Sequence, residues 1–417
     1  MTTLADRSPL PTRSRPAAVI WVRRNLLRTK LDVFLTVAFG AVGLLVLFHI
    51  FRFVFITARW EIVRVNLKLL LVGRWPVEHL GRIALVMITL GWWGGTIGGL
   101  IRAGQLRRGT ADFDLRGWAK ATDLGRRFGL LTATCLLILA LSTTSGPWLL
   151  AAGTLTAALI GRWGGSKIRS MPLAPALFRL GGVVLLATPF ILFLYLVSAV
   201  AFARWEGFLF NLTAAAAGII LCFPLGVLLA LGRRSTLPLL RSLSIGYIEF
   251  VRGSPLYVLL LLANVSLEFF VPSALAPSKP VRAVITFTLF TAAYLAEIVR
   301  GGLQSVPRGQ EEAAKALGLS PYRQMTRIVL PQALRNVIPA QIGQFISLFK
   351  DTTLAGLALG TFDLLSGGQA ITQQDSFRGQ GLIVESLVFV GFLFWVGSFT
   401  MSRESQRLER KLGVGTR

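Results

Sequence analysis

Long apolar segments alternate with short polar ones along most of the 417 residues of this chain. A helix needs about 20 predominantly apolar residues to cross the hydrocarbon core of a bilayer. Segments that approach or exceed this length lie at 31–51, 83–101, 128–145, 147–161, 177–202, 207–231, 247–270, 282–299, 335–362 and 382–401. The pattern predicts an all-α integral membrane protein with about 10 transmembrane helices, in a range of about 8–10.

Two of these segments do not fit a regular span. Residues 147–161 are fewer than a span normally needs, and 335–362 carries Lys350 and Asp351 near its middle. Charged groups and irregular backbone at this depth need protein or water around them. We therefore expect the helix of the ninth segment to be broken at Lys350 and Asp351.

Composition supports the membrane class. The chain is 53% hydrophobic and 15% charged, whereas soluble domains carry about 25% charged residues. A net charge of +25 raises nucleic-acid binding as an alternative. The basic residues, however, lie in short loops beside apolar segments, with no basic and aromatic stripe on a polar domain. Membrane lipid, and not nucleic acid, is the expected partner.

The sequence indicates neither a metal site nor a bound cofactor. Cys135 and Cys222 lie inside apolar segments, where cysteine is usually a small buried apolar residue. His49 and His79 lie far apart, and no spacing of cysteine and histidine is typical of a metal site.

The basic residues also predict an orientation. Positive charge gathers before residue 31, in the loops 102–127, 161–176 and 232–246, and after residue 402. Ten spans place all of these on one side of the membrane. Because positive loops face the cytoplasm, we expect a multi-pass protein of the bacterial inner membrane with both termini cytoplasmic.

Residues 52–82 do not follow this rule, because they are basic and yet fall on the opposite side. Part of this segment, Trp60–Leu71, mixes apolar and basic residues with a helical period. An amphipathic helix on the outer membrane surface would explain the pattern. A wrong span count would explain it too, and of these two open alternatives we favour the helix.

The polar segment with the most distinctive sequence pattern runs from Gln310 to Pro331, between the eighth and ninth apolar segments. It is rich in alanine, which favours helix and leaves a smooth surface that fits a groove in another protein. Gly318 permits a left-handed turn that ends a helix, and proline is favoured in a first helical turn. We therefore expect a short helix over 305–318, with Pro331 near the start of the next.

This segment resembles the EAA loop through which the permeases of ABC importers contact their ATPase. Six motifs in order resemble the polar amino-acid family of these permeases. They are Asn211-Leu212-Thr213, Tyr247 to Leu256, Ala293 to Gly302, Gly309 to Ala314, Leu330 to Arg335 and Phe349 to Leu354. The chain departs from the family at Thr353, where serine is usual.

The resemblance implies a domain organisation. Residues 205–401 would form the five-span permease core, with Ala203–Gly207 as the boundary. Residues 1–204 would be an N-terminal extension of about five spans, and 402–417 a basic cytoplasmic tail. An extension of this kind is similar to that of the broad-specificity amino-acid subgroup.

The resemblance also implies function and partners. The chain would translocate amino acids together with ABC ATPase subunits, a related second permease and a periplasmic amino-acid-binding protein. No Gly-x-x-x-x-Gly-Lys-Ser/Thr motif occurs, so the chain is expected not to be an enzyme, and ATP would be used by the partner. The coupling residues would be Gly309, Glu311, Glu312, Ala313, Ala314, Gly318 and Pro331.

Polar residues inside the predicted spans are candidates for the substrate pathway. An amino-acid zwitterion needs an acid for its ammonium group and donors for its carboxylate, which hydroxyls and broken helix ends supply. The candidates are Tyr294, Glu297, Gln341, Gln344, Lys350, Asp351 and Thr352. Alternatively, Glu297 with Arg300, and Glu249 with Arg252, form structural ion pairs at i,i+3 spacing.

Two other classes of function would require features that the sequence lacks. A secondary transporter driven by an ion gradient would show paired broken helices in repeated halves, and the sequence has no strong internal repeat. A membrane enzyme or assembly factor would need a catalytic cluster on a loop, and the loops here are mainly basic.

Overall fold

The computed structural model describes residues 25–26, 28–107, 117–142, 144–168, 174–272 and 275–412. Over these residues the secondary structure is helical apart from one isolated bridge between Gly207 and Asp363. This confirms the predicted all-α class. The chain divides into two compact units, Met1–Trp60 and Glu61–Arg417.

The first unit contains one long apolar helix. Helix α2 (Lys30–Arg52) continues into a π-helical turn, η1 (Phe53–Thr57), and matches the predicted span 31–51. Thr29 caps its start in a capping box, in which Asp32 N donates to Thr29 Oγ1 and Thr29 N donates to Asp32 Oδ2. None of the described side chains of α2 is buried, as expected of a helix surrounded by lipid.

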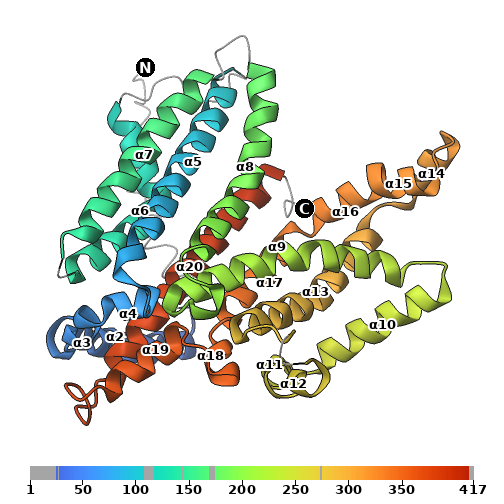
Figure 1. Ribbon diagram of the computed structural model, residues 1–417. Coiled ribbons are helices and arrows are strands. Elements are labelled where there is room, and N and C mark those ends of the chain that lie inside the picture. The colour runs from blue at the N-terminus through green and yellow to red at the C-terminus, as the bar shows by residue number, and fades with distance from the viewer. Residues whose placement is uncertain are drawn as a thin grey trace, which may run out of the picture. The chain divides into compact units, whose positions relative to one another are not determined.

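The second unit begins with the segment that connects to four long helices. These elements are α3 (Glu61–Val65), α4 (Leu67–Val72), η2 (Val77–His79), α5 (Leu80–Arg107), α6 (Gly117–Leu141), α7 (Gly146–Ile168), α8 (Ala174–Val197) and η3 (Phe202–Arg204). Helices α5 to α8 run side by side in Figure 1. Helix α7 has 23 residues, so the predicted segment 147–161 is part of a helix that is long enough for a span.

Helices α5 and α7 pack with their backbones in contact. A Cβ atom built on Gly95 would lie 1.9 Å from the Ala158 carbonyl oxygen, and one on Gly161 would lie 2.2 Å from the Trp92 oxygen. The same holds for Gly99 and Gly165. The residue numbers of the contacting pairs rise together along both helices, so the two helices are parallel. Glycine is required here because any side chain would separate the two backbones.

The remaining elements of the second unit are α9 (Gly207–Arg233), α10 (Pro238–Gly253), α11 (Leu256–Val265), α12 (Leu267–Phe270), α13 (Lys279–Ser305), α14 (Arg308–Ala316), α15 (Pro321–Gln324), η4 (Met325–Val329), α16 (Leu330–Asn336), α17 (Ile338–Asp351), α18 (Leu354–Leu359), α19 (Leu364–Ala370), η5 (Ile371–Gln373) and α20 (Ile383–Leu412). Helices α9 and α13 lie against each other at the centre (Figure 1). Buried apolar clusters surround Phe287 at one level of α13 and Leu295 at another.

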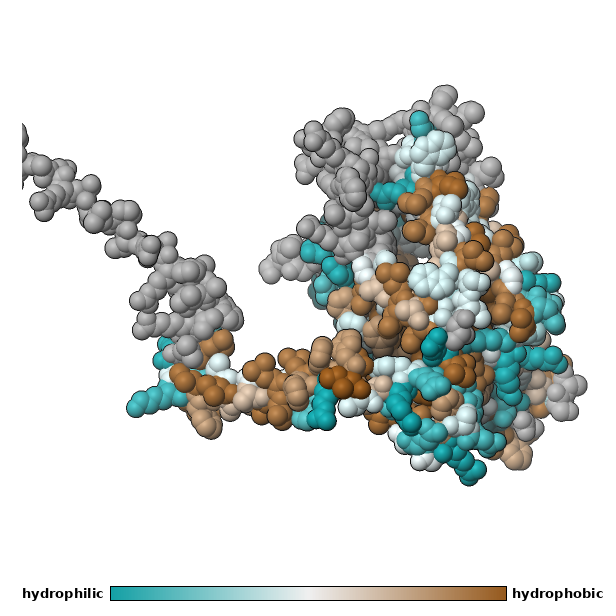
Figure 2. Space-filling view, turned by 90° about the vertical axis from the view of Figure 1, so that its left-hand side faces the viewer, coloured by the Kyte–Doolittle hydropathy of each residue, from teal (hydrophilic) through white to brown (hydrophobic). Residues whose placement is uncertain are grey.

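Five helices in the described ranges are long and apolar enough to cross a membrane. They are Lys30–Thr57, Val77–Leu100, Gly207–Arg233, Lys279–Ser305 and Ile383–Arg410. A sixth candidate is the pair α10 and α11, which is bent by 103° where Pro255 removes a backbone donor. Figure 2 shows extensive hydrophobic surface on the face it presents. The count of about 10 spans stays a prediction.

The predicted break in the ninth segment is confirmed. Helix α17 ends at Asp351, Thr352 is its C-cap, and α18 starts at Leu354. The segment 335–362 therefore contains the end of α16 followed by the short helices α17 and α18, instead of one straight span.

The predicted amphipathic helix Trp60–Leu71 is present as the short helices α3 and α4, but lipid does not cover its apolar face. Ile62, Val63, Leu67 and Leu70 are buried, and the two helices pack against α9, α19 and α20. Protein therefore covers the apolar face, since the period of the pattern identifies such a face without showing what covers it, and the position on the outer membrane surface stays a prediction.

The segment Ala203–Gly207, proposed as a boundary, lies inside the second unit. Trp205 packs edge-on against Trp75, both nearly inaccessible, and Glu206 accepts from Arg74 N at 2.9 Å and Nε at 3.0 Å. The hydrogen bond between the Arg74 side chain and Glu206 raises the pKa of the Arg74 guanidinium above its ordinary value. The extension and the core are thus joined tightly at this point.

Helix α20 also extends into the expected tail. It runs to Leu412, so residues 402–412 continue the last long helix. Residues 413–417 lie outside the described part of the chain.

Candidate functional site

Helix α14 forms the first part of the polar segment Gln310–Pro331. It covers Arg308–Ala316 and is shorter than the predicted 305–318, because Val306 and Pro307 are extended and separate it from α13. At its end, Gly318 has a φ of 70°. Gly318 N donates to Lys315 O at 2.9 Å, and Leu319 N donates to Ala314 O at 3.2 Å. This pair of bonds is a Schellman motif, so Gly318 ends the helix as predicted.

One face of α14 is attached to the protein and the other is open. Ala314 is buried and lies on the side that packs against η4. The open face carries the exposed Gly309, Glu312, Ala313 and Ala316, and the exposed side chains of Arg308, Gln310 and Lys315 border it. Next to them, Leu317 is 78% and Tyr322 76% exposed. In Figure 1, α14 and α15 lie beyond the end of α16. A smooth helix flanked by exposed apolar side chains is suited to contact another protein.

The segment after α14 returns through a π-helical turn. Helix η4 covers Met325–Val329, and Pro331 lies exposed in the first turn of α16, as predicted. Proline is tolerated there because the first amides of a helix have no partner within it. The turn therefore sets the angle at which α14 and α15 leave α16.

Glu297 lies in a network of arginines. Its Oε1 is 2.6 Å from Arg233 Nη1, and its Oε2 is 2.8 Å from Arg300 Nη2 and 4.0 Å from Arg252 Nη1. The predicted i,i+3 pair of Glu297 and Arg300 is thus present. Both carboxylate oxygens already have a cationic partner, so the geometry favours a structural role over binding of a substrate ammonium group.

The neighbouring pair differs from the prediction. Glu249 Oε1 accepts from Arg233 Nη1 at 3.0 Å, so Glu249 joins the network through another helix. Arg252 lies over the ring of Tyr294, with 5.6 Å to its centroid, and Tyr294 Oη donates to Arg252 O at 3.4 Å. Tyr294 therefore belongs to the surroundings of the same arginine.

A second polar cluster surrounds Thr352. Its hydroxyl is fully buried, donates to Phe349 O at 2.7 Å, and accepts from Asn211 Nδ2 at 3.1 Å. Asn211 Oδ1 in turn accepts from Leu364 N at 2.9 Å. Asn211 thus ties the start of α9 to the break after α17 and to the start of α19.

Asp363, which is not among the residues predicted from the sequence, borders this cluster. It caps α19 by accepting from Ser366 N at 2.8 Å. Burial raises the pKa of the Asp363 carboxyl, and the bonds from Ser366 oppose that rise. The only sign in the sequence was an acid just before Leu364 with a serine three residues on, a helix-start pattern.

The pathway candidates do not form one site. Thr352 lies near Asn211 at the start of α9, whereas Glu297 contacts Arg233 at its end. At 1.5 Å per residue these two ends of α9 are about 33 Å apart. A single amino acid cannot touch both. Lys350 and Asp351 belong to the Thr352 end, because they are the last residues of α17.

Gln341 and Gln344 lie on α17 before its broken end. Gln341 is buried, and its Nε2 has no hydrogen-bond partner within the described ranges. Gln344 is half-buried. A buried donor without a partner is costly, so Gln341 is the candidate with an unused hydrogen bond to offer.

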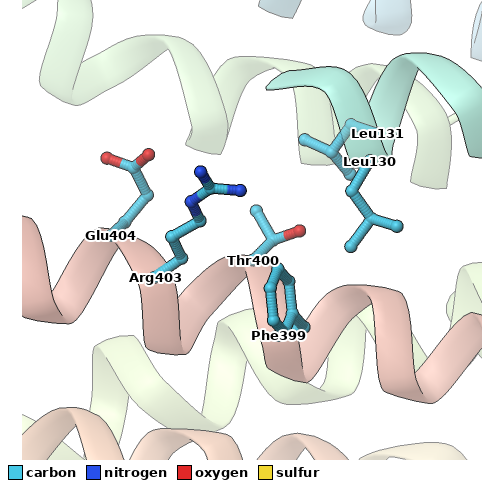
Figure 3. A pocket seen from close by; sticks show the side chains of 6 residues that line it. All are labelled: Leu130, Leu131, Phe399, Thr400, Arg403 and Glu404. Atoms are coloured by element: carbon cyan, nitrogen blue, oxygen red, sulfur yellow. The ribbon is translucent and has the colours of Figure 1, made fainter. Parts of the chain in front are cut away.

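The hollow in Figure 3 lies elsewhere. Leu130 and Leu131 line it from α6, and Phe399, Thr400, Arg403 and Glu404 line it from α20. Glu404 is paired with Arg407. None of the pathway candidates lines this hollow.

Comparisons with known proteins decide the family. Residues 222–414 match the family described as binding-protein-dependent transport system inner membrane component. The glutamate/aspartate import permease protein GltK of Escherichia coli O157:H7 is 32% identical over 211 residues, which are 49% of this chain and 92% of GltK. The chain belongs to this permease family. This is the family that the sequence motifs indicated.

Two longer permeases share more identity. The glutamate/glutamine/aspartate/asparagine transport system permease protein BztC of Rhodobacter capsulatus is 46% identical over 209 residues, 50% of this chain and 48% of BztC. The inner membrane amino-acid ABC transporter permease protein YhdY of Escherichia coli is 42% identical over 212 residues, 51% of this chain and 57% of YhdY. The match thus spans about half the length of these two relatives.

The matched region of the permease family contains α14, the Glu297 network and Thr352. It begins inside α9. The elements before α9, including the α5–α7 pair, lie outside it.

Proposed function

We propose that this chain is a permease subunit of an ABC importer that carries amino acids from the periplasm into the cytoplasm. The observation that carries the proposal is α14, a short helix ended by Gly318 that exposes the small residues Gly309, Ala313 and Ala316 beyond α16. Relatives named for glutamate, glutamine, aspartate and asparagine transport favour polar amino acids as cargo.

The proposed mechanism is alternating access driven from the cytoplasm. A separate ATPase subunit binds and hydrolyses ATP, and a groove in that subunit receives the face of α14 formed by Gly309, Glu312 and Ala313. Ala314 holds α14 against η4, so a push on α14 is passed to the turn before α16. The chain itself has no Gly-x-x-x-x-Gly-Lys-Ser/Thr motif for ATP.

Further subunits complete the proposed importer. A periplasmic binding protein delivers the amino acid, and a related second permease forms the other half of the pathway. The distribution of basic loops supports cytoplasmic termini and a cytoplasmic α14.

Within this chain, we assign the Thr352 cluster and the Glu297 network to opposite ends of the pathway. The broken end of α17, with Lys350, Asp351 and Thr352, lies toward the periplasm. Gln341, with its free buried amide, is the donor best placed to meet a substrate carboxylate inside the membrane. Gln344 and Tyr294 stay candidates for the same route.

The test replaces Gly318 by valine. A β-branched residue at a φ of 70° is strained, and the end of α14 should be distorted while the membrane helices stay intact. We expect uptake of labelled glutamate or glutamine to fall about tenfold or more, at normal abundance and with weaker co-purification of the ATPase.

Gly379 provides the matched control, because it has a φ of 75° and lies exposed in the loop before α20. Gly379→Val introduces the same backbone strain away from α14 and should keep its uptake. If Gly318→Val transports normally at normal abundance, the coupling role of this segment is wrong.

A further inference from the structure

Two consecutive arginines at the end of α9 make ion pairs in opposite directions. Arg233 Nη1 is 2.6 Å from Glu297 Oε1 on α13 and 3.0 Å from Glu249 Oε1 on α10. Arg234 Nη2 is 3.6 Å from Glu311 Oε1 on α14. The end of α9 is therefore bound both to the helices of the pathway and to the proposed coupling helix.

The two sides of this link differ in strength. On the pathway side, the side chains of Arg233 and Glu297 are 24% and 16% exposed, and Arg300 holds the second oxygen of Glu297. On the coupling side, Arg234 and Glu311 are 38% and 35% exposed. Partly buried pairs held by several partners resist separation, whereas a single half-exposed pair adds little to stability.

The two sides are joined through neighbouring residues of one backbone. Consecutive Cα atoms are about 3.8 Å apart and rigidly joined. A displacement of α14 that pulls Arg234 through Glu311 must therefore also move Arg233. Since Arg233 contacts both Glu249 and Glu297, that movement changes how α10 and α13 are held at this end.

We propose that Arg233 and Arg234 are positioning residues that transmit displacement of α14 to an ion-pair gate formed by Glu249, Arg252, Glu297 and Arg300. The gate holds the ends of α9, α10 and α13 together when α14 is at rest. This inference rests on the proposed function and adds a connection from α14 to α9, besides its covalent continuity with α13.

The first experiment reverses the weak pair. Arg234→Glu, Glu311→Arg and the double variant are reconstituted with the ATPase and binding protein, and uptake is measured together with ATP hydrolysis. Each single variant should lose about fivefold in amino acid transported per ATP, the upper range for one half-exposed ion pair. The double variant should recover most of the loss, because the pair is restored with opposite polarity.

Arg241→Glu is the control for charge. Arg241 is an exposed residue of α10 that forms no ion pair within the described residues, and this reversal should not change transport per ATP. If Glu311 acted only on the ATPase, the double variant would stay defective, and the link would be refuted. Single variants that behave like Arg241→Glu would refute it as well.

The second experiment separates a gate from a substrate ligand at Glu297. Glu297→Gln should lower the maximal uptake rate and raise ATP hydrolysis in the absence of binding protein, because the closed gate is weakened. It should leave the KM for the amino acid unchanged. A raised KM with normal basal hydrolysis would instead place Glu297 in the substrate site.

A third readout does not depend on transport. In the complex without ATP, Arg234→Glu should increase hydrogen exchange of the α14 amides relative to Arg241→Glu, because one attachment of α14 is lost. Unchanged exchange would contradict the link. Absence of ATP-dependent uptake by the wild-type complex would contradict the proposed function, and the exchange data would still test the link.

Discussion

At the scale of single residues, the buried polar contacts are made by side chains that are far apart in the chain. Gly318 could be predicted, since a glycine after an alanine-rich helix has one common use, and its φ of 70° agrees. The partners of Glu297 could be predicted only for Arg300, three residues away. Arg233 lies 64 residues before Glu297, and no local pattern connects residues at such separation.

Asn211 connects the buried polar cluster around Thr352. Removing the Asn211 side chain should therefore destabilise the protein. Asn211→Ala leaves the buried Thr352 hydroxyl with one partner fewer and Leu364 N with none from this side chain. We expect the free energy of unfolding to fall by about 2–3 kcal/mol. The measurement is the thermal unfolding midpoint of the purified protein in detergent.

Asn336→Ala is the control for this prediction. Asn336 Nδ2 also donates a hydrogen bond, to Ser305 Oγ at 3.0 Å, but the pair is exposed to solvent. Its loss should shift the midpoint much less. Equal shifts for both variants would show that burial at Asn211 has no special weight.

At the scale of elements, helix positions followed the apolar pattern, while bends and partners did not. The break at Thr352 could be predicted because charged residues interrupt an apolar segment. The 103° bend between α10 and α11 was not predicted, although Ser254-Pro255 marks it. The buried face of α3 and α4 was assigned to lipid, because amphipathic periodicity is the same whether lipid or protein covers the face.

The parallel α5–α7 pair gives a prediction at this scale. Gly95→Leu places a side chain where the Ala158 carbonyl lies 1.9 Å from the Cβ position, so the two helices must separate. Overpacking of this kind costs about 1–3 kcal/mol. We expect a lower thermal unfolding midpoint and reduced abundance in the membrane.

The neighbouring glycine is the matched control. A Cβ atom on Gly94 meets nothing within 4 Å, so Gly94→Leu should be tolerated with wild-type abundance. The packing of α5 against α7 is wrong if both variants are tolerated equally.

At the scale of the whole molecule, the apolar pattern predicted the class, the six sequence motifs predicted the family, and the basic loops predicted the orientation. The all-α membrane class and the permease family are confirmed. The span count could not be settled from hydropathy, because bent and broken helices replace some straight spans. The proposed limit at Ala203–Gly207 reflects where recognisable motifs begin, whereas Trp75–Trp205 packing joins the segments on either side of it.

Orientation can be tested by labelling single cysteines, with Cys135 and Cys222 replaced by alanine. Ser376 lies exposed in the loop before α20, and Arg241 lies exposed on α10. Each is replaced by cysteine in a separate variant. A membrane-impermeant maleimide should label position 376 in intact cells and position 241 only after permeabilisation. The reverse pattern would invert the proposed topology and place α14 outside the reach of an ATPase.

The measurement that tests the central claim most directly is uptake of labelled glutamate and glutamine by proteoliposomes that contain the complete complex. ATP is supplied on the side of α14, and ionophores remove the ion gradients. We predict uptake that requires ATP and the binding protein and that persists with ionophores. Uptake that is independent of ATP and abolished by ionophores would contradict the account.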